Sequence, residues 1–128
     1  MRFIVKERDK SSARKTQKQR IVKMAKKKMD SKMEYLFNGI LSLATVEECM
    51  SFFEDICTVT EIIEMSIRLT AAKMLSDNYT YTDIIEKTGL STATISRVNR
   101  CLKYGSDGYT AVLRHLDDKG ETPFEENE

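Results

Sequence analysis

The segment from Tyr81 to Tyr104 constrains the fold most, because its apolar residues are spaced for two short helices separated by one glycine. The apolar faces expected for these helices comprise Ile84, Ile85 and Thr88 in the first, and Ile95, Val98 and Leu102 in the second. Gly89 can adopt a positive φ at the turn without a Cβ penalty. Leu90 is expected to pack into the corner, and the Ser91 hydroxyl can cap the second helix. The segment therefore predicts a helix-turn-helix over about residues 81–104.

The outer face of the second helix carries small hydroxyl side chains followed by cations. A recognition helix presents its first turn to base edges and its flank to phosphates, which suits this order. The candidate DNA-binding residues are Ser91, Thr92, Ala93, Thr94, Ser96, Arg97, Arg100 and Lys103. One position departs from the usual motif, because the residue four before the glycine is normally small and here is Ile85. The alternative is a helix-loop-helix corner with a polar outer face and no ligand.

The composition predicts an all-α fold. The chain has 128 residues, enough for one domain with a genuine core. Its single proline is Pro123, helix breakers are almost absent from residues 1–88, and no stretch sustains the alternation typical of strands. Hydrophobic residues make up 41% and charged residues 32%, which is typical of a protein with a large charged surface rather than a membrane span.

The net charge of +1 conceals a strong asymmetry. Residues 1–32 hold 13 Lys and Arg against 3 Asp and Glu, whereas the remainder holds 8 against 17. Residues 1–30 are predicted to be a basic flexible arm that adds sequence-independent affinity for a polyanion. The alternatives are a solvated tail without a role, or a reading frame whose true start is Met24, Met29 or Met33.

The middle of the chain predicts three further helices within a domain of residues 31–116. An amphipathic helix follows Ser31, and capping boxes at 45–48 and 58–61 each begin another helix. The third helix is expected to be the central, most buried element, because its apolar residues nearly encircle it. These residues are Ile62, Ile63, Met65, Ile67, Leu69, Ala72, Met74 and Leu75. The 77–78 pair is a turn signal, and residues 117–128 are predicted to be an acidic flexible tail.

The three helices carry more large apolar side chains than they can bury on one another. The excess lies on Leu36, Phe37, Ile40, Phe52, Phe53 and Ile56. A homodimer would bury this surface and would space two recognition helices about one DNA turn apart. The alternative is a monomer in which the basic arm or the carboxyl-terminal helix covers the surface.

Catalytic and metal chemistry find little support in the sequence. Cys49, Cys57 and Cys101 do not have metal-ligand spacing, and His115 is the only histidine. The chain also lacks a glycine-rich phosphate loop, so an enzyme is not expected. Reduced thiols, the lack of an apolar run of about 20 residues and the lack of a signal peptide predict a cytoplasmic protein.

Several local segments resemble the Trp repressor-related proteins of the YerC/YecD type. The resemblance extends from about residue 34 to residue 109. Its main segments are 36–43 (LFNGILSL), 52–59 (FFEDICTV), 67–69 (IRL), 91–98 (STATISRV) and 100–105 (RCLKYG). The resemblance implies an all-helical, intertwined homodimer that regulates transcription.

The better-known Trp repressor binds L-tryptophan as a corepressor between two arginines, with threonines nearby. The resemblance implies a corresponding small-molecule pocket of Thr58, Arg68, Thr94 and Arg97 in this chain. Val98 stands where the repressor has a glycine beside its ligand. In the alternative, Arg68 and Arg97 form ion pairs or bind phosphates.

The sequence thus favours a sequence-specific DNA-binding transcriptional regulator, repressor-like, whose partners are double-stranded DNA and a second copy of itself. No cofactor is required, although L-tryptophan or another small effector is an option. A helical protein-interaction module without direct DNA binding is the alternative from another class.

Overall fold

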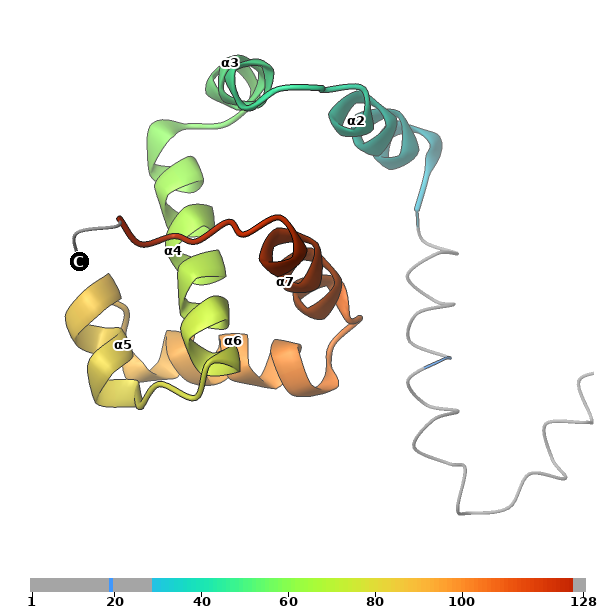
Figure 1. Ribbon diagram of the computed structural model, residues 1–128. Helices are drawn as coiled ribbons and strands as arrows, with labels where there is room; N and C mark the ends of the chain where they lie inside the picture. The colour runs from blue at the N-terminus through green and yellow to red at the C-terminus, as the bar shows by residue number, and fades with distance from the viewer. Residues whose placement is uncertain (1–18, 20–28, 126–128) are drawn as a thin grey trace, which may run out of the picture. The chain divides into compact units, whose positions relative to one another are not determined.

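The computed structural model describes Gln19 and residues 29–125, and the ordered elements of this part are six α-helices. They are α2 (Ser31–Leu41), α3 (Val46–Ile56), α4 (Val59–Ser76), α5 (Tyr81–Thr88), α6 (Thr92–Tyr104) and α7 (Gly108–Asp118) (Figure 1). The predicted all-α fold is confirmed for this part. The chain divides into two compact units, and the boundary falls inside α3, between Cys49 and Met50. The predicted basic arm lies outside the described residues except for Gln19, Met29 and Asp30.

Side-chain caps begin the helices where the sequence predicts them. The Glu61 backbone N–H donates to the Thr58 hydroxyl over 3.2 Å, and the Thr58 N–H donates to the Glu61 carboxylate over 2.7 Å. An equivalent pair of hydrogen bonds joins Thr45 and Glu48. These bonds satisfy N–H groups that have no partner within the helix. Backbone N–H donors stabilise the carboxylate form, so the pKa of Glu48 is lowered by the N–H groups of Ala44 and Thr45, and the pKa of Glu61 is lowered by the N–H of Thr58.

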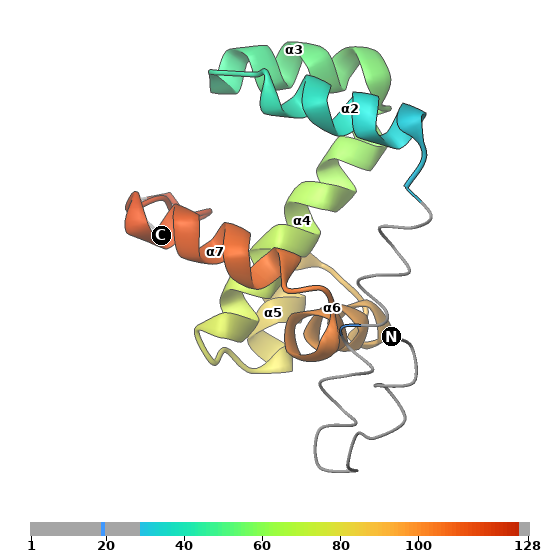
Figure 2. The same ribbon diagram turned by 90° about the vertical axis from the view of Figure 1, so that its right-hand side faces the viewer.

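The core of the second unit forms around the carboxyl-terminal half of α4. Ala71 and Met74 pack with Ile84 of α5 and Ile95 of α6, and all four are almost completely excluded from solvent. A second cluster joins Ala72 of α4 to Val98 of α6 and Leu113 of α7. Figures 1 and 2 show α5, α6 and α7 arranged around this half of α4.

α4 holds more buried residues than any other described helix, as the prediction of a central, most buried element requires, but its amino-terminal half is exposed. Ile63 is 50% exposed, and Val59 and Met65 are also exposed. α2 and α3, every residue of which is described, contain no buried side chain. The exposure of this half was not foreseen, because apolar periodicity identifies a face that is able to be buried but does not identify what covers it.

The segment after α7 also differs from the predicted acidic flexible tail. Asp117 and Asp118 form the last turn of α7, and Phe124 packs against the Ala71–Met74–Ile84–Ile95 cluster. Phe124 also places its ring 5.4 Å from the Lys87 ammonium, a cation–π contact. The prediction weighed the acidic composition of the segment and overlooked the single aromatic side chain. Residues 126–128 of the predicted tail lie outside the described residues.

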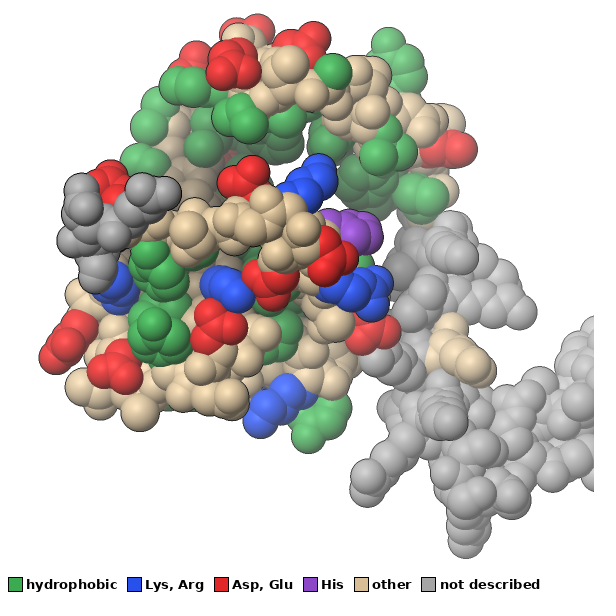
Figure 3. Space-filling view, in the orientation of Figure 1, with side chains coloured by type: hydrophobic (Ala, Val, Ile, Leu, Met, Phe, Trp, Pro, Cys, Tyr) green, Lys and Arg blue, Asp and Glu red, His purple; other side chains and the backbone are tan. Residues whose placement is uncertain are grey.

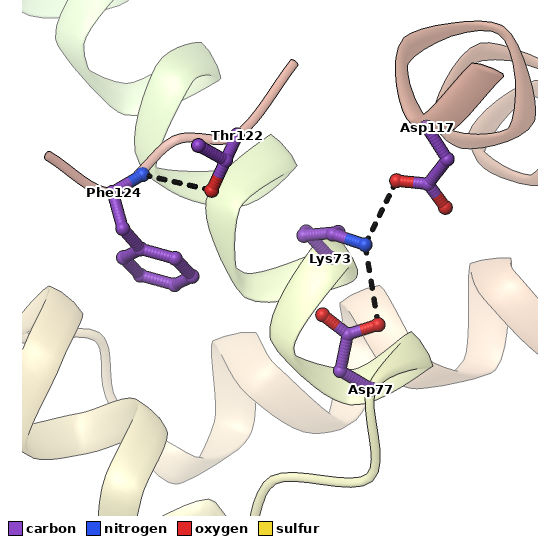
Figure 4. Close-up of polar contacts among 5 residues, drawn as sticks. All are labelled: Lys73, Asp77, Asp117, Thr122 and Phe124. Carbon is purple, nitrogen blue, oxygen red and sulfur yellow. Dashed lines mark hydrogen bonds and ion pairs between the residues drawn. The ribbon is translucent and has the colours of Figure 1, made fainter. Parts of the chain in front are cut away.

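One lysine connects α4 to α7. The Lys73 ammonium lies 2.8 Å from an Asp117 carboxylate oxygen and 3.2 Å from one of Asp77 (Figure 4). The hydrogen bond to Asp117 is the main reason why the pKa of Lys73 is raised. Nearby, the Phe124 N–H donates to the Thr122 hydroxyl, which orders the segment that carries the aromatic ring.

The capping box of α4 predicts a pH-dependent stability difference for Glu61→Gln. Because its pKa is lowered in the folded state, Glu61 stabilises the fold above its unfolded pKa, and this contribution is lost as the pH falls through the folded pKa. We expect the variant to be less stable than the parent at neutral pH and the difference to vanish in acid. Urea unfolding from about pH 7 to about pH 3 measures this. Glu64→Gln on the same helix is the control, and identical profiles for the two variants would contradict the prediction.

Candidate nucleic-acid interface

The turn between α5 and α6 is built from backbone conformation and one hydroxyl. Gly89 has φ +72°, a left-handed conformation that an L-residue with a Cβ would adopt only with strain. Its N–H donates to the Ile85 carbonyl over 2.8 Å, which closes α5. The Thr88 hydroxyl donates to the Ile84 carbonyl and accepts from the Leu90 N–H. These bonds fix the angle at which the chain enters α6, and the predicted glycine turn is confirmed.

Packing of one face of α6 determines which face is presented to solvent. Ile95 is fully buried and Val98 is 2% exposed, and both lie against α4. Because an α-helix turns by about 100° per residue, the face opposite these two residues carries positions 93, 97, 100 and 104. Ala93, Arg97 and Arg100 are all exposed. The helix-turn-helix therefore turns a continuous stripe of α6 outward.

Not every part of the predicted apolar face in α5 is buried. Ile84 is fully buried and Thr88 is half-buried, but Ile85 is 39% exposed and points away from the core. The small residues that allow the helices to approach closely are instead Ala71 and Ala72 of α4. A bulky residue four positions before the glycine is therefore compatible with the motif, because its side chain lies outside the contact.

The outward side of α6 is cationic. Arg97, Arg100 and Lys103 are exposed, and α6 contains no acidic residue. In Figure 3, one small blue group of Lys or Arg atoms projects at the lower edge of the view, where Figure 1 draws α6. The chain as a whole has a net charge of only +1, so this surface is a local positive region. Such a region attracts phosphates over short distances without a strong overall field.

The first turn of α6 presents the predicted hydroxyl residues unequally. Ser91, Thr92 and Ser96 are exposed, whereas Thr94 is half-buried. Ser91 caps α6 by accepting from the Thr94 N–H over 3.2 Å, and the hydroxyls of these two residues lie 3.1 Å apart. The predicted cap is confirmed. The hydroxyls of Ser91 and Thr94 therefore already have polar contacts within α6, whereas no such contact involves the hydroxyls of Thr92 and Ser96 among the described residues.

Three of the four predicted pocket residues line one groove beside α6. Arg68, Thr94 and Arg97 surround a space of about 440 Å³, together with Val98, Cys101 and Tyr109. Thr58 does not line the groove. Sequence reasoning missed Cys101 and Tyr109. Helical spacing could have indicated Cys101, which lies four residues after Arg97, whereas Tyr109 reaches the groove only because α7 packs on α6.

Neither a metal site nor a membrane-spanning helix is found among the residues that the structure describes. In this part of the chain, no three His, Cys, Asp or Glu side chains lie close enough to hold a metal ion together. No helix among those described has the length and hydrophobicity that crossing a membrane requires.

The helices and the exposed stripe define the class: an all-α protein with a helix-turn-helix. Residues 31–117 match the Trp repressor protein family, and the chain belongs to that family. YerC of Bacillus subtilis (strain 168), an uncharacterised protein, is 53% identical over 81 residues, which cover 63% of this chain and 78% of YerC. The predicted resemblance is thereby confirmed. The Trp repressor family is regulatory rather than enzymatic.

Two solved structures are similar in fold and sequence. A TrpR-like protein from Eubacterium eligens ATCC 27750 has a TM-score of 0.68 and 49% identity, covering 77% of this chain and 99% of that one. A candidate Trp repressor from Staphylococcus aureus has a TM-score of 0.68 and 47% identity, covering 72% of this chain and 92% of that one.

The position of Val98 in the groove predicts that L-tryptophan does not stabilise the protein. The branched Val98 side chain forms part of the wall and is packed into the core, so it is not free to move aside for an indole ring. We expect millimolar L-tryptophan to leave the melting temperature unchanged. Ligand at about 100 times its Kd would stabilise the folded state by about 2.7 kcal/mol, an effect that thermal unfolding would detect. A melting temperature that rises with tryptophan concentration would contradict this prediction.

Proposed function

We propose that this protein is a sequence-specific DNA-binding transcriptional regulator that inserts α6 into the major groove. The observation that carries the proposal is the exposed stripe of α6, which combines Ala93, Arg97 and Arg100 without any acidic side chain. The family assignment supports it, because the family is one of repressors. The packing of Ile95 and Val98 supports it further, because burial of these two residues turns the stripe toward solvent.

The residues of α6 divide into two roles by their position. The residues around the amino terminus of α6 approach base edges. They are Ser91, Thr92, Ala93, Thr94 and Ser96. The cations Arg97, Arg100 and Lys103 bind phosphates, and Arg97, one turn from Ala93, is also suited to a guanine. A good bidentate contact between an arginine and guanine gives about 1–3 kcal/mol of discrimination against other bases.

A homodimer is the second part of the proposal. The sequence predicted six apolar residues that the helices could not bury on one another. Three of them are exposed, namely Leu36, Phe37 and Ile56, and three are half-buried, namely Ile40, Phe52 and Phe53. The large apolar side chains exposed on α2, α3 and the first half of α4 include Met33, Leu36, Phe37, Leu41, Val46, Met50, Ile56, Val59, Ile63 and Met65. So many exposed apolar residues are unusual for a monomer, and a second copy would bury them. We place the dimer in the cytoplasm.

The dimer predicts that a charge on α4 weakens self-association. We expect the parent chain to sediment with the mass of two chains at micromolar concentration. Ile63→Glu should raise the dissociation constant at least about tenfold, because an unpaired carboxylate would be buried in the interface. Sedimentation equilibrium measures both, and Ile85→Glu, which alters an exposed isoleucine on α5, is the control. A monomeric parent would contradict the prediction.

The DNA interface predicts a loss of affinity in Arg97→Ala and Arg100→Ala. Each variant should bind its selected operator about tenfold more weakly than the parent, since each loses a charged contact. Arg114→Ala on α7 removes another exposed arginine, one that lies outside the stripe of α6, and this variant should bind normally. A mobility-shift titration with duplexes selected from a random pool measures these affinities. If both α6 variants bind as well as the parent, α6 does not contact DNA.

The protein-interaction alternative makes the opposite prediction. It rests on the acidic composition of residues 33–128, which hold 17 Asp and Glu against 8 Lys and Arg. A module that binds only protein would show no salt-dependent affinity for any duplex, and the same titration therefore separates the two functions.

A further inference from the structure

Tyr104 is an exposed aromatic residue at the carboxyl-terminal end of the recognition helix. Its side chain is 77% exposed, and it belongs to neither core cluster. It follows Arg97 by seven residues and Arg100 by four, so it lies on the same outward stripe of α6. Within the described residues its phenolic hydroxyl forms no hydrogen bond. The stripe therefore ends in a polar group that is available to a ligand.

The chain leaves α6 immediately after Tyr104 in a way that keeps this side chain clear. Gly105 donates its N–H to the Cys101 carbonyl over 2.9 Å and then adopts an extended conformation. A Cβ at position 105 would overlap the Cys101 carbonyl oxygen, so the close approach requires glycine. The turn directs the following residues toward α7, which packs on α6 through the Val98–Leu113 cluster. Tyr104 is thus the last residue of the outward stripe.

The length of α6 indicates what Tyr104 would meet on DNA. The helix rises about 1.5 Å per residue, so its twelve steps from Thr92 to Tyr104 span about 18 Å. The major groove is only about 12 Å wide. If the first turn of α6 lies at the base edges, the last turn lies beyond the groove, at the level of the sugar-phosphate backbone.

We propose that Tyr104 is a DNA-positioning residue whose phenolic hydroxyl donates a hydrogen bond to a backbone phosphate oxygen. This inference rests on the proposed function and adds a contact that is polar but uncharged. A neutral donor displaces no counterion, whereas an arginine or lysine on a phosphate does. The hydroxyl therefore contributes affinity without contributing to the salt dependence of binding.

The test compares Tyr104→Phe with Arg100→Ala in the full-length chain, using operator and unrelated duplexes over a range of salt concentrations. We expect Tyr104→Phe to weaken binding to both duplexes about five- to tenfold and to leave the slope of log affinity against log salt unchanged. Arg100→Ala should reduce that slope by about 0.9. Tyr79→Phe, which alters a 45% exposed tyrosine between α4 and α5, outside the stripe and the proposed dimer surface, is the matched control.

A second measurement locates the contact. Duplexes with single methylphosphonate substitutions remove one phosphate charge at a time. We expect one position per half-site at which the substitution weakens the parent but not Tyr104→Phe.

The outcomes separate the two proposals. If the parent binds no duplex at any salt concentration, the proposed function fails. If Arg97→Ala and Arg100→Ala lose affinity while Tyr104→Phe binds like the parent, only the inference about Tyr104 is overturned.

Discussion

The packing of α5 and α6 against the carboxyl-terminal half of α4 is the interaction on which the rest of this structure depends. Ile84 and Ile95 are fully buried there, and the small side chains of Ala71 and Ala72 allow the three helices to approach closely. α5 has only eight residues, which is too short for a helix to be stable alone in water. Its conformation is therefore maintained by burial against α4, and the position of α6 depends on the same contacts.

This packing separates α6 into a buried face and a charged face. The buried face determines the orientation of the helix, and the exposed side carries three cations within a chain of low net charge. Arg97 lies between the outward stripe and the groove that it shares with Arg68 and Tyr109. An anionic or aromatic molecule in this groove would compete for the same guanidinium that the proposed interface uses on DNA. Arg97 therefore belongs both to the groove and to the proposed interface.

Local structure could be predicted well from the sequence because its causes are local. The helix-turn-helix predicted at about 81–104 agrees with α5 and α6, which begin at Tyr81 and end at Tyr104. The capping threonines, the left-handed Gly89 and the Ser91 cap each depend on residues no more than four positions away. The exposure of Ile85 and of the first half of α4 could not be predicted, because apolar spacing does not reveal which neighbour, if any, covers a face. The contact of Phe124 with the core was missed for the related reason that it joins distant parts of the chain.

The sequence by itself therefore determined where the helices begin and end, the glycine turn, and the order of hydroxyl and cationic residues along α6. Capping, φ preference and periodicity act over a few residues, so their physical causes are contained in short segments of sequence. Only the tertiary structure decided that Arg68, Arg97 and Tyr109 share a groove, that Tyr104 ends the outward stripe, and that α4 is covered along half its length. These features depend on how separate helices pack, and packing is determined by the shapes of surfaces that lie far apart in the chain.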